Sequence, residues 1–434
     1  MRDQRSRSLR ASSGKEATTV RNTSPDPTTG QAVGPHGPTR TGRIGSGLVG
    51  IGLIASLAGC GTSATAPPAA TEVRTYIAGS SCFGNAIDAS GHIWIANGGN
   101  GFPGTASGDS NVTELSPSGT VIGTYVAGSV PIGIAVDRSG NVWVENYGNG
   151  TMGTATGDSN VTELSPTGTV VGTYVVGSYP AGGIAIDRSG NVWVTNWGAA
   201  SETAGTPGTA PGQSNVTELS PTGTLMGTYV AGSSPGGIAI DASGNVWVAN
   251  KGDGNQGTGL TDGNVTELNS SGTTIGTYIA GSHPEGVAID PGGNVWVVNK
   301  GNGTPGTAVG DSNVTKLSPS GEVIGTYVGG SLPEIVAVDA AGNVWVTNGY
   351  GVGTSAKRNS VTELSPSGTL IGTHVTGAQP YGLAIDRSGN VWVTNYGNGT
   401  PGTGAADSNV QVYVGAAKGP QYFPYAGPQW PGAE

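Results

Sequence analysis

The chain repeats one short apolar block seven times. The block reads Asn-Val-Trp-Val in six copies and His-Ile-Trp-Ile in the first. Its tryptophans are 47 to 54 residues apart, at Trp94, Trp143, Trp193, Trp247, Trp296, Trp345 and Trp392. Self-similarity at such a period indicates one supersecondary unit in tandem. A unit this small cannot bury its own apolar face, so neighbouring units must stack and the repeat number determines the architecture.

Each repeat predicts four antiparallel strands. In the third copy, residues 183–187 and 191–196 alternate around Asp187-Arg188-Ser189-Gly190, which suits a type I turn closed by a left-handed glycine. After a Gly-rich loop, residues 216–220 and 224–230 alternate around a second tight turn. Four-stranded units of about 50 residues with an aromatic signature are typical of β-propeller blades.

The two ends of the repeat region predict how the ring closes. Residues 72–78 match the fourth strand of the first repeat, whereas the last repeat ends after its third strand, at residues 410–414. The N-terminal strand should therefore complete the C-terminal blade, which removes two exposed sheet edges. The sequence predicts an all-β, seven-bladed β-propeller over residues 71–415, with four antiparallel strands in each blade.

Two sets of repeated side chains have structural interpretations. The tryptophans could form an aromatic binding ring, but their flanking valines favour packing between adjacent blades. An aspartate ends each first strand and could bind cations in a channel. Its place at the start of a tight turn instead favours a turn cap, which accepts hydrogen bonds from backbone N–H groups two residues on. These aspartates are Asp88, Asp137, Asp187, Asp241, Asp290, Asp339 and Asp386.

The charge balance limits the partners. Beyond residue 59 the chain has 10 Lys and Arg residues against 25 Asp and Glu residues, a net charge of −15. A surface of this sign repels nucleic acid and offers no basic stripe. We expect a monomer that binds no nucleic acid.

The N-terminal region indicates export. An uncharged stretch, residues 44–59, follows Arg40 and Arg43 and ends at Cys60. Its 16 residues are too few to span a bilayer as a helix, and four glycines interrupt it. The stretch resembles a bacterial lipoprotein signal, which implies cleavage before Cys60 and lipid attachment to its thiol. Ordinary secretion is the alternative.

The remaining segments follow from that resemblance. Residues 1–59 form the leader and signal peptide, and residues 60–70 form a flexible tether. Gly61 is not the aspartate that tends to hold such lipoproteins at the inner membrane, so we expect an anchor in the cell envelope, preferably at the outer membrane or its periplasmic face. Residues 416–434 are a tail rich in proline and aromatics that either packs beneath the ring or stays loose.

The repeats also resemble a known family. Pro-Glu-Gly-Val-Ala-Ile-Asp at 284–290, Pro-Tyr-Gly-Leu-Ala-Ile-Asp at 380–386 and the Gly-Asn-Val-Trp-Val that follows resemble NHL-repeat and virginiamycin B lyase-like propellers. The likeness covers about residues 71–415. It implies the fold strongly and the activity weakly, because such blades serve lyases, lactonases and plain binding proteins.

The resemblance implies two kinds of metal site, neither of which the motifs assign. Streptogramin lyases of this group use histidines and glutamates near the channel with Mg²⁺. Here His92, His283 and His374 are the histidines beyond the leader, and no two of them are placed to meet. Related lactonases bind a divalent cation through Glu, Asn and Asp. The asparagines that end the second strands reach the right end of the blades, but no motif fixes such a set. We predict no cofactor, and Mg²⁺ or Ca²⁺ in the channel only if the protein is an enzyme.

A binding face is nevertheless predicted. The two tight turns of each repeat are nearly uniform and lie at one end of the blades, while both variable connections lie at the other. Function in propellers usually sits around the channel mouth on the loop side. Aromatic and charged candidates converge there: Glu145, Tyr147, Trp197, Lys251, His283, Glu285, Lys300, Glu334, Tyr381 and Tyr396.

That mixture would suit a glycan or peptide, free or on an envelope protein, with aromatic faces for stacking and charges for orientation. The alternative is a variable solvated loop surface without a ligand. For the whole protein the sequence favours a lipid-anchored, non-catalytic binding scaffold. Its rival is a metal-dependent lyase or lactonase of the virginiamycin B lyase or gluconolactonase type.

Overall fold

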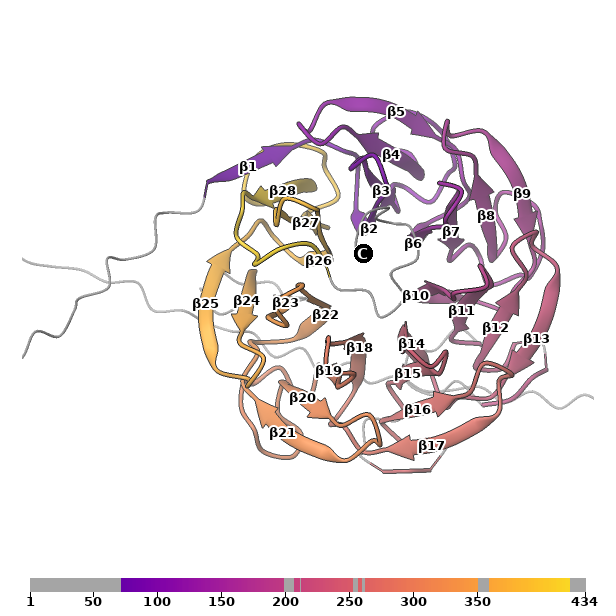
Figure 1. The fold of residues 1–434 in the computed structure, drawn as a ribbon. Helices are drawn as coiled ribbons and strands as arrows, with labels where there is room; N and C mark the ends of the chain where they lie inside the picture. The colour runs from indigo at the N-terminus through magenta and orange to yellow at the C-terminus, as the bar shows by residue number, and fades with distance from the viewer. Residues whose placement is uncertain are drawn as a thin grey trace, which may run out of the picture. The chain divides into compact units, whose positions relative to one another are not determined.

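The computed structural model describes residues 72–198, 207–210, 212–252, 257–259, 262–349 and 359–421. These residues form seven four-stranded antiparallel sheets arranged in a ring (Figure 1), as predicted. Within these ranges there is no helix with the length and apolar character needed to cross a bilayer. The predicted leader, Cys60 and the tether lie outside the described residues, as does the tail beyond residue 421.

The strands occupy the same four radial positions in every blade. The first strands line the centre: β2 (Cys82–Ile87), β6 (Pro131–Val136), β10 (Pro180–Ile186), β14 (Pro235–Ile240), β18 (Pro284–Ile289), β22 (Pro333–Val338) and β26 (Pro380–Ile385). The second strands are β3 (Ile93–Asn97), β7 (Val142–Asn146), β11 (Val192–Asn196), β15 (Val246–Asn250), β19 (Val295–Asn299), β23 (Val344–Asn348) and β27 (Val391–Asn395).

The outer half of each blade follows the same plan. The third strands are β4 (Asn111–Leu115), β8 (Asn160–Leu164), β12 (Asn215–Leu219), β16 (Asn264–Leu268), β20 (Asn313–Leu317), β24 (Ser360–Leu364) and β28 (Asn409–Tyr413). The fourth strands form the rim: β5 (Val121–Tyr125), β9 (Val170–Tyr174), β13 (Leu225–Tyr229), β17 (Thr274–Tyr278), β21 (Val323–Tyr327), β25 (Leu370–Val375) and β1 (Val73–Tyr76). We number the blades 1 to 7 from β2 onward.

The ring closes through the N-terminal strand. β1 pairs with β28 in antiparallel register, Val73 opposite Tyr413 and Tyr76 opposite Val410. Blade 7 is therefore a four-stranded sheet of order β1-β28-β27-β26 (Figure 1). The predicted closure is confirmed.

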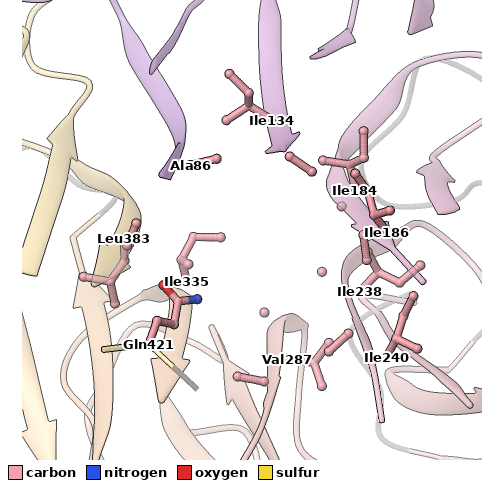
Figure 2. Close-up of a pocket in the computed structure, with 18 of the residues that line it drawn as sticks. Ala86, Ile134, Ile184, Ile186, Ile238, Ile240, Val287, Ile335, Leu383 and Gln421 are labelled. Carbon is pink, nitrogen blue, oxygen red and sulfur yellow. The ribbon is translucent and has the colours of Figure 1, made fainter. Parts of the chain in front are cut away.

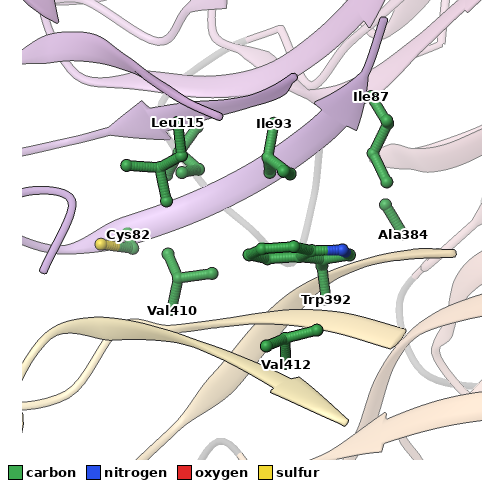
Figure 3. Close-up of a cluster of buried hydrophobic side chains, with 9 residues drawn as sticks. Cys82, Ile87, Ile93, Leu115, Ala384, Trp392, Val410 and Val412 are labelled. Carbon is green, nitrogen blue, oxygen red and sulfur yellow. The ribbon is translucent and has the colours of Figure 1, made fainter. Parts of the chain in front are cut away.

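The repeated tryptophans fill the spaces between blades. Trp392 of blade 7 packs against Ile87 and Ile93 of blade 1 (Figure 3), and Trp94 packs in the same way against Ile134 of blade 2. All seven are at most 1 % exposed. They form the hydrophobic core, as predicted, rather than a binding ring.

The end of the blades that carries the tight turns, here called the turn face, is built from a repeated hydrogen-bond network. In blade 2, Asp137 accepts the backbone N–H groups of Ser139 and Asn141 at 2.8 Å each, and Trp143 Nε1 at 3.2 Å. Asn141 Nδ2 also donates to Glu163, across the sheet, at 2.9 Å. The aspartates are turn caps, as predicted.

Part of the C-terminal tail packs on this face. The backbone N–H of Ala340 donates to the carbonyl of Pro420 at 2.7 Å, and that of Lys418 donates to Asp339 at 2.9 Å. Gln421 ends this strap, and its side-chain oxygen accepts the Ile385 N–H at 3.1 Å. The strap, residues 415–421, thus crosses beneath blades 6 and 7.

Candidate functional site

A central channel runs between the seven first strands. The cavity measures about 300 Å³, and its wall consists mainly of isoleucine, valine, leucine and alanine side chains that point inward (Figure 2). Gln421 also reaches into it from the strap (Figure 2). The strap lies on the turn face. The opposite end of the blades, which carries the variable connections, is here called the loop face, and a ligand can meet varied side chains at the channel mouth on that face.

The backbone around the mouth has the same form in every blade. The residue before each first strand has a left-handed conformation, with φ between 49° and 53°, although none is glycine: Ser81, Val130, Tyr179, Ser234, His283, Leu332 and Gln379. Its carbonyl accepts the N–H of the residue that follows the second strand, as in Tyr147 to Val130 at 3.0 Å. Left-handed φ at a β-branched residue such as Val130 is a strained arrangement of the kind found at functional sites.

Two positions of each blade therefore lie at the mouth. One is the residue directly after the second strand: Gly98, Tyr147, Trp197, Lys251, Lys300, Gly349 and Tyr396. The other is the second residue of the first strand: Phe83, Ile132, Ala181, Gly236, Glu285, Glu334 and Tyr381. Eight of the ten predicted site residues occupy these positions.

Blades 4 to 6 form the charged half of the mouth. Lys251 Nζ lies 2.8 Å from Glu285 Oε1, and Lys300 Nζ lies 2.9 Å from Glu334 Oε1. Each lysine thus reaches the glutamate of the following blade. Both glutamates are buried, Glu334 to 1 % exposure. Such a pair needs its partner, because removing one ion leaves the other charge buried and uncompensated.

The two glutamates differ in their pKa values. Burial would raise the pKa of Glu285, but the nearby ammonium groups of Lys251 and Lys300 outweigh it and hold that pKa below the ordinary value. Burial raises the pKa of Glu334 to about 7, helped by the negative charge of Glu285 and opposed by Lys300. Glu334 therefore holds its proton more tightly than Glu285 does.

Aromatic rings form the other half. Phe83 lies between Tyr381 and Tyr396, with ring centroids 5.3 and 5.0 Å away. In blades 2 and 3, the ring of Tyr147 lies 4.7 Å from that of Tyr179 and 5.9 Å from that of Trp197.

The two halves meet at blade 3. Lys251 Nζ sits 4.2 Å from the centroid of the Trp197 ring, within cation–π range. Lys251 therefore contacts both an aromatic face and a carboxylate, so that one side chain connects the aromatic and charged parts of the mouth.

The remaining two predicted residues have different surroundings. His283 is one of the left-handed residues, and its ring lies near enough to Glu285 to act on that carboxyl electrostatically. Glu145 is fully buried beside Gly133 and Gly182, and neither of its carboxylate oxygens has a hydrogen-bond partner among the described residues. Burial raises the pKa of Glu145 well above its ordinary value. A ligand would meet Glu145 only behind the wall of the mouth.

Two residues of the mouth were not among the predicted site residues. Phe83 occupies a mouth position in blade 1, where it meets Tyr381 and Tyr396. Tyr179 takes the left-handed position before Pro180, which corresponds to His283 in blade 5. Aligning the repeats on the residue before that proline would have revealed Tyr179.

The residues present do not fit a divalent cation in the channel. The asparagines that end the second strands turn into the blades, where Asn146 Nδ2, for example, donates to Asn160 Oδ1 at 2.8 Å and to Thr162 Oγ1 at 3.0 Å. The described channel wall is mainly aliphatic. Its aspartates, Asp137 and Asp187, are turn caps, and Glu285 and Glu334 at the mouth are paired with lysines. Hard cations require several converging oxygen ligands, which this wall does not offer.

Comparison with known proteins gives a fold. No known protein family matches the sequence, and no curated protein does. A streptogramin B lyase structure superimposes with a TM-score of 0.56 at 14 % identity, covering 78 % of this chain and 97 % of that one. Virginiamycin B lyase from Staphylococcus aureus gives 0.56 at 13 %, covering 79 % and 99 %.

A hydrazine synthase from Kuenenia stuttgartiensis matches equally well, with a TM-score of 0.56, 16 % identity, and coverage of 76 % of this chain and 96 % of that one. Proteins with different names thus share this architecture, and sequence identities this low indicate a similar fold only. The chain is a seven-bladed β-propeller with a fold similar to that of virginiamycin B lyase.

Proposed function

We propose that this protein is a lipid-anchored propeller of the cell envelope that binds a ligand at its channel mouth without transforming it. The observation that carries the proposal is the contrast at the mouth itself. One backbone arrangement recurs in every blade, yet the side chains it presents differ and gather into an aromatic half and a charged half. Binding sites combine apolar or aromatic walls with a few oriented polar groups in this way.

The chemistry of the mouth favours a peptide, free or on an envelope protein, over a neutral glycan. Lys251, Glu285, Lys300 and Glu334 offer both signs of charge side by side. A peptide can meet both signs with its termini and side chains, while its apolar side chains stack on rings such as that of Trp197. A neutral glycan could meet these charged groups only through its hydroxyls.

The test is a binding screen with a matched pair of variants. The Cys60→Ser full chain would be screened against an immobilised peptide library and a glycan array. We expect peptides to be retained, and we expect Trp197→Ala to weaken peptide binding at least tenfold. Ile275→Ala is the control, because Ile275 lies exposed on the rim and should leave binding unchanged. Retention of glycans alone would mean that the ligand is a sugar and not a peptide. Retention of neither, or equal losses in both variants, would contradict the proposal.

Lipid anchoring has its own test. In a bacterial host, the unmodified chain should sediment with membranes and incorporate labelled palmitate, whereas Cys60→Ala should do neither. Cys60 lies outside the described residues and Cys82 is buried, so the substitution removes the one thiol proposed for acylation. Equal membrane association of both proteins would exclude this anchor.

The enzyme alternative gains no support from the mouth. The likeness to lyase structures concerns the fold, and the channel wall is mainly aliphatic in the part of the chain that the structure describes. We therefore expect ligand binding at the mouth to be the same in EDTA and in millimolar Mg²⁺ or Ca²⁺, as measured by calorimetry.

A further inference from the structure

Blade 1 departs from the other six at its tight turn. In blades 2 to 7, an asparagine follows the turn glycine: Asn141, Asn191, Asn245, Asn294, Asn343 and Asn390. Blade 1 has His92 there. The surrounding pair of carboxylates, Asp88 and Glu114, is retained from the common pattern, so the histidine stands where two acidic side chains already converge.

The exchange changes the hydrogen-bond balance. In blade 2, Asn141 Nδ2 has two hydrogens and donates to Asp137 at 3.1 Å and to Glu163 at 2.9 Å. In blade 1, a single ring nitrogen takes that place. His92 Nδ1 lies 2.7 Å from Glu114 Oε1 and 3.5 Å from Asp88 Oδ2. A ring nitrogen carries at most one hydrogen, so it can satisfy only one of the two carboxylates.

A metal ion would satisfy all three groups together. The ring nitrogen and the two carboxylates can each offer one ligand atom, and these atoms lie within 4.8 Å of one another. We infer that Asp88, His92 and Glu114 form a binding site for a divalent transition-metal ion on the turn face of blade 1. One imidazole with two carboxylates suits a borderline ion such as Zn²⁺ better than Ca²⁺ or Mg²⁺, which take oxygen ligands.

The carboxylates are already oriented by the blade. Trp94 Nε1 donates to Asp88 Oδ2 at 3.0 Å, and the Tyr125 hydroxyl donates to Glu114 Oε2 at 2.8 Å. Glu114 Oε1 is thereby left to face the histidine. Such outer hydrogen bonds are typical of metal sites, where they fix the direction of each ligand. The His92 side chain is 32 % exposed, which gives an ion a path from solvent and leaves room for water as a further ligand.

The site is separate from the proposed ligand-binding mouth. It lies at the turn end of blade 1, where β2 and β3 are joined, whereas the mouth is on the loop face. The ion would link that turn to β4, in the blade that packs directly against the closing blade 7. Its expected effect is therefore on stability, and it should raise the unfolding temperature by a few degrees at saturating metal.

The other blades supply the control for the experiment. The Cys60→Ser full chain, stripped with EDTA, would be titrated calorimetrically with ZnCl₂ alongside His92→Asn, which installs the side chain of the six sister blades and should fold normally. We expect one ion per wild-type chain, and at least a tenfold loss of affinity in His92→Asn. Zinc-edge absorption spectra should show nitrogen and oxygen ligands and no sulfur.

The reciprocal variant tests the geometry itself. Asn141→His places an imidazole between Asp137 and Glu163 of blade 2, and should raise the stoichiometry to two ions per chain. The inference is overturned if the wild type binds no zinc at 1 mM, if His92→Asn binds it unchanged, if sulfur appears among the ligands, or if folded Asn141→His still binds a single ion. None of these outcomes bears on peptide binding at the mouth, so the two proposals fail independently.

Discussion

The turn face and the loop face are built from the same seven repeats, yet they use their side chains in opposite ways. On the turn face, the aspartate bonds to the asparagine or the tryptophan of its own blade, as Asp137 does to both Asn141 and Trp143 in blade 2. On the loop face, the residues that follow the second strands are held by backbone bonds, as between Tyr147 and Val130, and their own side chains vary. Positions whose side chains form the structural hydrogen bonds keep the same residue type in nearly every blade. Positions that are held by backbone hydrogen bonds differ in residue type.

The comparison is tested most severely by two tryptophans. Burying a tryptophan removes about 150 to 250 Å² from water, and Trp247→Ala should cost about 3 to 5 kcal/mol in the free energy of unfolding, measured by urea denaturation. Trp197→Ala, at the mouth, should cost less than about 1 kcal/mol. Similar losses in both variants would abolish the distinction between the two faces.

Removing a turn cap should lower the free energy of unfolding by less than removing a core tryptophan. Asp241 accepts the backbone N–H groups of Ser243 and Asn245 at 2.8 and 3.0 Å, and Trp247 Nε1 at 3.1 Å. Asp241→Ala leaves these donors without a partner and should cost about 1 to 3 kcal/mol. The control is Ser243→Ala, which keeps the backbone donor and should change stability by no more than about 0.5 kcal/mol. Equal stabilities in the two variants would show that the aspartate does not cap the turn.

The smallest effect is a pH dependence at the loop face. The pKa of Glu145 is raised in the folded protein from an unfolded value near 4.5 because the carboxyl is buried. The folded state then holds its proton more tightly, so this group's contribution to stability is fully present below about pH 4.5 and declines as the pH rises above it. Glu145→Gln should reduce the loss of stability between pH 5 and pH 8, measured by urea titrations at both.

Glu322→Gln provides the comparison for that measurement. Glu322 lies exposed at a tight turn of blade 5, so its removal should leave the pH slope as it is in the wild type. An unchanged slope in Glu145→Gln would mean that this carboxyl titrates as if it were in water.

The fold could be predicted because the repeats carry its physical causes in local form. Turn residues, period-two alternation and one tryptophan per unit define a blade. The unmatched strands at residues 72–78 and 410–414 define the closure. The mouth positions follow from strand direction alone, which is why the repeat pattern suffices to place residues such as Trp197 and Tyr381 at the loop face.

The contacts within the mouth were not predicted, because they join different blades. Lys251 and Glu285 are 34 residues apart, as are Lys300 and Glu334. That constant separation is the number of residues from the end of a second strand to the start of the next first strand. It brings the two side chains together only when adjacent blades are stacked. The bulge in β10, next to Glu145, comes from one extra residue in Pro180–Ile186 and depends on the same stacking.

The direction of β1 determines the face of the propeller at which the described chain begins. Val73, the first residue of that strand, lies opposite Tyr413 at the turn end of β28, and the strap that follows β28 stays on the same side up to Gln421. The described part of the chain therefore begins and ends at one pole of the propeller. Within the described residues, neither end of the propeller therefore crosses the aromatic and charged mouth at the opposite pole.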